Sequence, residues 1–277
     1  MTIVIIEMNI LNIDRRINLK KEYNSLKEDF ADIVIDRAEN IIKKEVIIKS
    51  TYQSHFGMYE LAILENEAEI RVINRKIDLA NEYMKNEKEI DEEKIKEIVH
   101  SEELAFNEII EDKKNRIKKA NDYLKRERLT DREQDRMRDS LRLLVMKLHP
   151  VLSKNSDEKS VMMLEKALDS FIDNNYGKMR MLENIIDSSV KKEESLSEKD
   201  MINEIERLKK AISDEIMQAG FEKKERIFEM EEIVFDIVKV EKQKNILKEE
   251  LKTEQKLKNN LKYKLELLEK IYNFNLE

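Results

Sequence analysis

The stretch RLLVMKLHPVLSKNSDEKSVMMLEKAL, residues 142–168, contains Pro150, the single proline of a 277-residue chain. Apolar residues at helical spacing lie on both sides of it, and a polar run separates them. Proline has no amide hydrogen and disfavours helix in the residue before it, so the first helix is expected to end there. The stretch therefore predicts two short helices that are separated by a polar loop.

The composition of the whole chain predicts long helices. Charged residues make up 41% of it, and it has only three glycines and one proline. Tight turns depend on glycine and proline, so few such turns are expected. Periodic Ile and Leu among Glu and Lys is typical of helical hairpins and coiled coils. We therefore predict an all-α fold of elongated helical hairpins or coiled coil with an embedded module of short helices.

The first thirteen residues, MTIVIIEMNILNI, are apolar but do not have the pattern of a targeting or membrane segment. No basic region precedes the apolar run, Glu7 interrupts it, and it is too short to span a bilayer. We expect a first helical turn packed in the core, or a short strand, with contact to a membrane surface as the weaker alternative. The absence of cysteine excludes disulfides and thiolate metal sites. We expect a cytoplasmic protein without a membrane span.

Apolar spacing divides the chain into three predicted regions. Residues 1–128 are expected to form long coiled-coil helices, residues 129–188 a module of short helices, and residues 189–277 a C-terminal helical hairpin or coiled coil. The long helices before residue 128 and after residue 197 are predicted to pair as one stalk. SSVKKEESLSEKD, residues 188–200, is the one stretch that has the composition of a linker.

Local signals mark the expected ends and contacts of these helices. The heptad seam over residues 59–84 has Asn66 as its single polar member, and a buried Asn at such a position often fixes register. Gly57 is expected at a kink or a tight helix–helix junction, and Gly220 at a turn. The longest helix is predicted from about residue 222 to residue 273. The expected helix N-caps are Asp91, Thr130 in a capping box with Glu133, Ser156 and Ser197.

The positive charge of this acidic chain is concentrated in one window. The net charge is −7, but residues 113–147 contain thirteen Lys or Arg and six acids, so the window carries +7 and the remainder −14. Such a patch attracts an acidic partner, and a solvated helix face with intrahelical ion pairs is the alternative. The basic-patch candidates are Lys113, Lys114, Arg116, Lys118, Lys119, Lys125, Arg126, Arg128, Arg132 and Arg136.

The loop at Pro150 and the helices beside it resemble the J-domain of the heat-shock co-chaperones, and most closely the bacterial J-like proteins in which this module is embedded in coiled coils. In that family a basic amphipathic helix leads into a His-Pro-Asp loop, and a second helix packs back on the first. HPVLSKNSDEK and SFIDNNYGKM match that layout. The resemblance implies a packing face made of Leu141, Leu144, Val145 and Leu148 from the first helix and Leu164, Ala167, Ser170 and Phe171 from the second.

The resemblance also implies a partner surface, and one departure from the family changes the expected activity. The loop Asp of the family stimulates ATP hydrolysis by the heat-shock chaperone ATPase, and Val151 stands at its position here. Valine has no charge and accepts no hydrogen bond, so we predict a retained fold with a lost or altered activity. The candidate partner-binding residues are Arg138, Arg142, Lys147, His149, Pro150 and Val151.

The sequence has no residues at the spacing of a catalytic or metal site. The three histidines, His55, His100 and His149, lie far apart, and none has a second ligand at metal-binding spacing. The three dispersed glycines cannot build a phosphate-binding loop. We therefore expect no enzyme activity, no metal and no cofactor.

The leading hypothesis is a non-enzymatic scaffold or adaptor that offers the degenerate J-like module and its helical surfaces to another protein. The expected partner is another protein, which the sequence does not identify; the heat-shock ATPase and a protein encoded nearby are the two candidates. One alternative is a co-chaperone that docks the heat-shock ATPase through Arg142, Lys147 and His149 despite Val151. A second alternative is a nucleic-acid-binding accessory protein that uses residues 113–147. Apolar seams can be satisfied within one chain or between copies, so the sequence leaves a homo-oligomer open.

Overall fold

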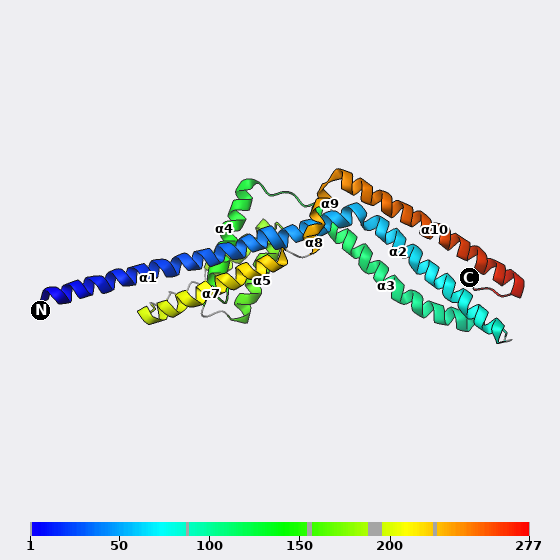
Figure 1. Cartoon of the computed structure of the whole chain (residues 1–277), viewed down its shortest axis with the longest axis horizontal. Coiled ribbons are helices and arrows are strands. Elements are labelled where there is room, and N and C mark those ends of the chain that lie inside the picture. Colours follow the sequence, from blue (N-terminus) through cyan, green and yellow to red (C-terminus); the bar gives the residue numbers. More distant parts are fainter. Residues whose placement is uncertain (1, 87–88, 154–156, 188–195, 224–225, 277) are drawn as a thin grey trace. The chain divides into compact units, whose positions relative to one another are not determined.

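The structure, a computed structural model, describes residues 2–86, 89–153, 157–187, 196–223 and 226–276 (Figure 1). Every regular element among these residues is helical, which confirms the predicted all-α fold. The contacts divide the chain into two compact units, each built from separate stretches of sequence. Unit 1 comprises residues 1–46 and 127–228, and unit 2 comprises residues 47–126 and 229–277. The three predicted regions therefore do not correspond one to one with these units.

One uninterrupted helical path forms the first third of the chain. It consists of α1 (Thr2–Arg37), a π-helical segment η1 (Ala38–Lys43) and α2 (Lys44–Lys85). The backbone is helical from Thr2, so the alternative of an N-terminal strand is wrong. Apolar side chains recur along this path at helical spacing, and proline is absent from it, so every residue has the amide hydrogen that a continuous helix requires.

Unit 1 packs α1 against a group of shorter helices. These are α4 (Asp131–Leu148), α5 (Glu158–Ile172), α6 (Tyr176–Asp187) and α7 (Glu198–Glu222), and the short α8 (Arg226–Glu229) lies at the boundary with unit 2 in the sequence. α7 lies along α1, and α4 contacts α1, α5 and α6 (Figure 1). One continuous apolar core joins Phe30 and Ile35 of α1 to α4, α5, α6 and Leu208 of α7. Leu144 lies in this core without any exposed surface.

Unit 2 is built from α2, α3 (Glu92–Leu124), α9 (Glu231–Phe235) and α10 (Ile237–Tyr272). In the central part of the predicted seam, Ile63, Asn66, Ile70, Ile73, Ile77 and Ala80 are all buried. Gly57 lies inside α2 at a close approach to α3, since a Cβ added there would be 2.8 Å from Ile117 Cγ1. The tight junction is therefore the correct interpretation of Gly57, because α2 continues through it.

Most of the predicted helix starts are confirmed. Asp91 accepts from the Lys94 amide, Ser197 accepts from the Asp200 amide, and both halves of the Thr130–Glu133 capping box are present. The α5 cap was assigned one residue too early, because Asp157 accepts from the Ser160 amide. Ser156 and residues 188–195 of the expected linker lie outside the described residues.

Two predictions about the C-terminal region were wrong. Gly220 does not turn the chain, because α7 continues through it to Glu222. The helix predicted over residues 222–273 is divided at Met230 and Asp236 into α8, α9 and α10. Asp236 accepts from the amides of Val238 and Lys239, and such a side-chain cap offers the backbone an alternative to an unbroken helix. α10 therefore has 36 residues, and the longest helix is α2, with 42.

Candidate functional site: the His-Pro loop and the helices that cover it

The loop between α4 and α5 begins with a tight turn around His149. The His149 amide donates to the Val145 carbonyl at 3.0 Å and ends α4. The His149 carbonyl then accepts from the amides of Leu152 and Ser153, at 2.8 and 2.9 Å. Pro150 has no amide to place in this turn, so it fits between the two helices without loss of a hydrogen bond. Leu152 is buried in the unit 1 core, which anchors the turn.

The two helices joined by this loop bury the face predicted for them. Leu141, Leu144 and Val145 have no exposed surface, and Leu148 is also buried. On α5 the buried residues are Leu164, Ala167, Ser170 and Phe171. The Ser170 hydroxyl donates to the Lys166 carbonyl at 2.5 Å, so its polar atom is satisfied inside the core. The residues that the resemblance assigns to this packing face are therefore buried in the structure.

His149 faces α1. Its ring lies edge-on to the ring of Phe30, with centroids 4.9 Å apart. The Val151 amide donates to His149 Nδ1 at 3.2 Å, so Nδ1 acts as an acceptor and the imidazole is neutral. Burial lowers the pKa of His149 below its ordinary value of 6.5, and the charge of Glu215 on α7 opposes this shift. The side chain is therefore a packing and hydrogen-bonding group of the unit 1 interior.

The two arginines of α4 that the resemblance assigns to a partner surface are paired within the chain. Arg138 forms ion pairs with Asp36 at 2.6 Å and with Glu39 at 2.8 Å. Arg142 pairs with Asp32 at 2.5 Å. All three acids belong to α1 or η1, one or two helical turns apart, so they form an acidic row opposite the arginines. Lys147 is half-buried.

The loop also contacts α7 through a hydrogen bond. Arg207 donates to the Val151 carbonyl at 2.7 Å and to Glu204 at 2.6 Å. Pro150 is exposed, and Val151 is half-buried against the unit 1 core. No local pattern in the sequence identifies Arg207 or Phe30 as a neighbour of the loop, because Arg207 lies 56 residues after Val151 and Phe30 lies more than a hundred residues before it. Periodicity identifies the apolar face of a helix but not the helix that covers it.

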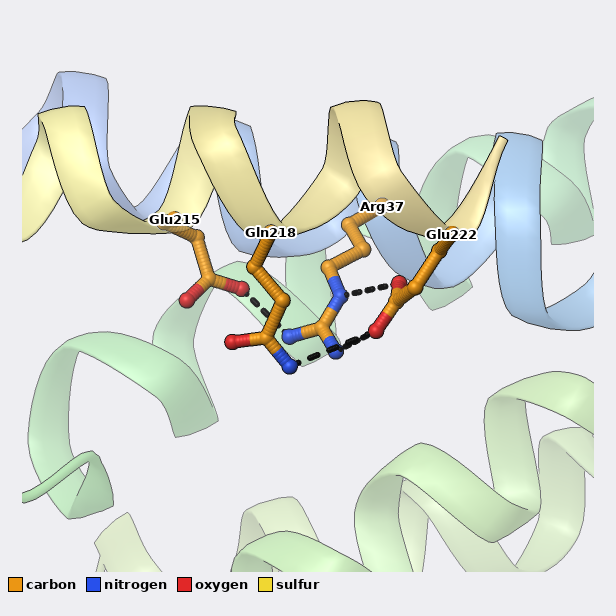
Figure 2. A network of polar contacts seen from close by, with 4 residues as sticks. All are labelled: Arg37, Glu215, Gln218 and Glu222. Carbon is orange, nitrogen blue, oxygen red and sulfur yellow. Dashed lines mark hydrogen bonds and ion pairs between the residues drawn. The ribbon is translucent and has the colours of Figure 1, made fainter. Parts of the chain in front are cut away.

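A cluster of charged side chains joins the C-terminal part of α7 to α1 by hydrogen-bonded ion pairs. Figure 2 shows Arg37, the last residue of α1, between two glutamates of α7. Arg37 Nε donates to Glu222 at 2.8 Å, Nη2 donates to the other oxygen of the same carboxylate, and Nη1 donates to Glu215 at 2.6 Å. Gln218 adds a 3.3 Å bond to Glu222. These hydrogen bonds raise the pKa of Arg37 and lower that of Glu222, so both groups are held in their charged forms.

The ten residues of the predicted basic patch are divided between the two units. Lys113 to Arg126 belong to unit 2, whereas Arg128, Arg132 and Arg136 belong to unit 1. Lys113 pairs with Glu60 at 2.5 Å, Lys114 with Glu111 at 3.1 Å, and Arg116 with Asp112 at 2.5 Å. The members with exposed side chains are Lys114, Arg116, Lys118, Lys119, Lys125, Arg126, Arg128, Arg132 and Arg136. Part of the window is therefore engaged in intramolecular ion pairs.

The remaining features to place are metal-binding groups, membrane-spanning helices and the methionines near the short helices. Within the described residues, no group of three or more His, Asp or Glu side chains is arranged to hold a metal ion. No helix in the described part of the chain has the length and apolar character needed to cross a membrane. Of the methionines near the short helices, Met179 is in the core, Met163 packs against it, and Met162 and Met181 are exposed.

Comparisons with known proteins leave the family open. No protein-family model, curated protein or solved structure matches the chain.

Proposed function

We propose that this protein is a non-enzymatic adaptor that binds another protein through exposed apolar faces of its helices. The observation that carries this proposal is a cluster on the outer side of α7. Met217 and Phe221, 58% and 63% exposed, lie one helical turn apart on one face of the helix, and Ile216, 55% exposed, lies next to Met217 in the sequence. Contiguous exposed apolar side chains rimmed by polar ones mark interaction sites, and an aromatic with an adaptable methionine is a common anchor.

The J-like module serves in this proposal as a packing element of unit 1. Its histidine contacts Phe30, its arginines pair with carboxylates of α1 and η1, and its loop carbonyl accepts from Arg207. A partner that needed these groups would have to compete with each of these contacts. The two arginines, the histidine and the Val151 carbonyl in the set that the resemblance assigns to a chaperone ATPase are therefore already used inside the chain, which favours binding through another surface.

A co-chaperone role is the second candidate, and the burial of the predicted α4 and α5 faces favours it. Stimulation of a heat-shock ATPase by the wild type, and by a Val151→Asp variant that restores the family's carboxylate, tests this role. We expect neither protein to stimulate, because Arg138, Arg142 and His149 stay engaged with α1 in both. Stimulation by the wild type would favour the co-chaperone.

The adaptor proposal is tested by site-specific cross-linking. A photoreactive phenylalanine analogue at position 221, introduced in the native host, should capture one defined protein, and the same analogue at the exposed Lys159 of α5 should not. The variant Ile216→Ser/Met217→Ser/Phe221→Ser should lose binding to that protein in purified form, while Ile17→Ser, an exposed aliphatic on α1, should keep it. Unchanged affinity of the triple variant, with wild-type helicity, would refute this surface.

A further inference from the structure

The chain reverses direction after α10 and folds back on unit 2 (Figure 1). Asn273 adopts a left-handed conformation with φ of 53°, and its amide and that of Phe274 both donate to the Glu269 carbonyl. Asparagine is the residue besides glycine that most often takes this conformation at a helix end. The reversal places residues 274–276 across α2, α3 and α10 without forming a helix or a strand.

Two alternate side chains of this segment are buried in an apolar core cluster, and the site that they fill is called the groove below. Phe274 is 7% exposed and Leu276 is 1% exposed, while Asn275 between them is exposed. The groove is lined by residues of three helices: Ile73, Ile77 and Ala80 of α2, Ile95 and Val99 of α3, and Leu265 of α10. Burial of alternate residues is the pattern of an extended peptide bound to a surface.

Beyond Phe274, the main chain of the segment is bound by side chains. The Asn275 amide donates to Glu92 Oε1 at 3.0 Å, and the Leu276 amide donates to Glu269 Oε1 at 2.9 Å. Lys76 Nζ donates to the Leu276 carbonyl at 2.5 Å. The three side chains that form these hydrogen bonds belong to α3, α10 and α2, so each helix supplies one. Such contacts depend on an extended backbone and not on the identity of the middle residue.

We propose that the groove between α2, α3 and α10 is a peptide-binding site for an extended Phe-x-Leu segment, which residues 274–276 of the same chain occupy. The partner is a protein that carries this pattern, an aromatic and an aliphatic side chain separated by one solvent-facing residue. A tethered segment has an effective concentration in the millimolar range, so an external segment binds well only when the internal one is displaced or weakened. This site lies in unit 2 and does not depend on the α7 surface.

The test uses the full chain with the variant Phe274→Ser/Leu276→Ser, which vacates the groove. A fluorescent peptide with the sequence IYNFNLE, residues 271–277, is titrated with each protein and followed by anisotropy. We expect saturable binding to the variant and at least about tenfold weaker binding to the wild type, because the wild-type groove is occupied. A peptide with serine in place of Phe and Leu should not bind either protein.

The side chains that bind the main chain of the segment allow a second test. In the vacated variant, Glu92→Ala should weaken peptide binding by about tenfold or more, the effect of one lost hydrogen bond to a charged group, while the neighbouring exposed Glu93→Ala should leave it unchanged. If the vacated variant retains wild-type helicity and shows no saturable binding, or if the wild type binds the peptide equally well, the proposal is overturned.

A measurement on the wild type covers the case in which the vacated variant does not fold. Excess free peptide should accelerate hydrogen exchange at the amides of Asn275 and Leu276, because their carboxylate partners become occupied by the competitor. Unchanged exchange at millimolar peptide overturns the proposal. A wild-type dimer held by exchanged 273–276 segments would instead make a second copy the occupant and overturn the assignment to a separate partner.

Discussion

The two units bury apolar side chains in different ways. In unit 1 one continuous core joins five helices, and the residues around Leu144 have neighbours on every side. In unit 2 separate smaller cores lie along the long helices, one around Leu61 and Ile117 and another around Ile77 and Leu276. A group of short crossing helices concentrates burial at a few residues, whereas long paired helices distribute it. The same substitution should therefore cost more in unit 1 than in unit 2.

The largest expected effect tests this difference directly. Leu144→Ala should lower the free energy of unfolding of unit 1 by about 4 kcal/mol, because a fully enclosed site cannot collapse around the cavity. Leu61→Ala, at a residue that remains 6% exposed, should cost unit 2 about 2 kcal/mol. Urea unfolding followed by circular dichroism measures the losses, and hydrogen exchange assigns each to its unit. Equal losses would contradict the contrast between the cores.

The next effect concerns the charged cluster that joins α7 to α1. Arg37→Met should destabilise unit 1 by about 2 kcal/mol, because two partly buried carboxylates lose their hydrogen-bonded cation. Lys258→Met, which removes an ion pair to the more exposed Glu69 in unit 2, should cost well under about 1 kcal/mol. The thermal midpoints of the two variants, measured in the same buffer, provide the comparison. A smaller loss for Arg37→Met than for Lys258→Met would show that burial does not decide the ranking.

The dependence of unit 1 on pH follows from His149. Burial lowers the pKa of His149 in the folded state, so the unfolded chain binds this proton more readily. The stabilisation from the neutral ring is complete above pH 6.5 and is lost as the pH falls from there toward the folded pKa, with a slope of at most about 1.4 kcal/mol per pH unit. The difference in stability between the wild type and His149→Gln should therefore shrink between pH 7.5 and 5.5. An unchanged difference would mean that the ring is not desolvated.

The smallest effects come from two glycines inside helices. Gly220→Ala should stabilise unit 1 by about 0.5–1 kcal/mol, because alanine is the better helix former and its Cβ meets nothing within 4 Å. Gly57→Ala should destabilise unit 2 despite the same propensity gain, because its Cβ would lie 2.8 Å from Ile117 Cγ1. Thermal unfolding of both variants measures the sign of each change. Stabilisation by Gly57→Ala would show that Ile117 can move aside.

The sequence allowed the local features of the fold to be predicted but not the long-range ones. The capping box at Thr130, the end of α4 before Pro150 and the buried face around Leu144 each depend on residues a few positions apart. The break at Asp236 was missed because apolar residues continue at helical spacing on both sides of it. The side-chain cap of Asp236 shows where the helical hydrogen bonds are interrupted. The ion pairs of Arg138 and Arg142 were also missed. Carboxylates occur on every helix, so charge alone does not identify the matching partner.

The division of each unit between distant stretches of sequence has a consequence for folding during synthesis. Arg142 pairs with a residue 110 positions earlier, and Arg37 with one 185 positions later. In unit 2, Lys76 donates a hydrogen bond to a carbonyl 200 positions later in the chain. Neither unit can close its apolar surface until late in translation, because its last helix has not yet been made. For most of its time on the ribosome the nascent chain therefore exposes Phe30 and Ile77, and holding chaperones should bind it until α7 and α10 emerge.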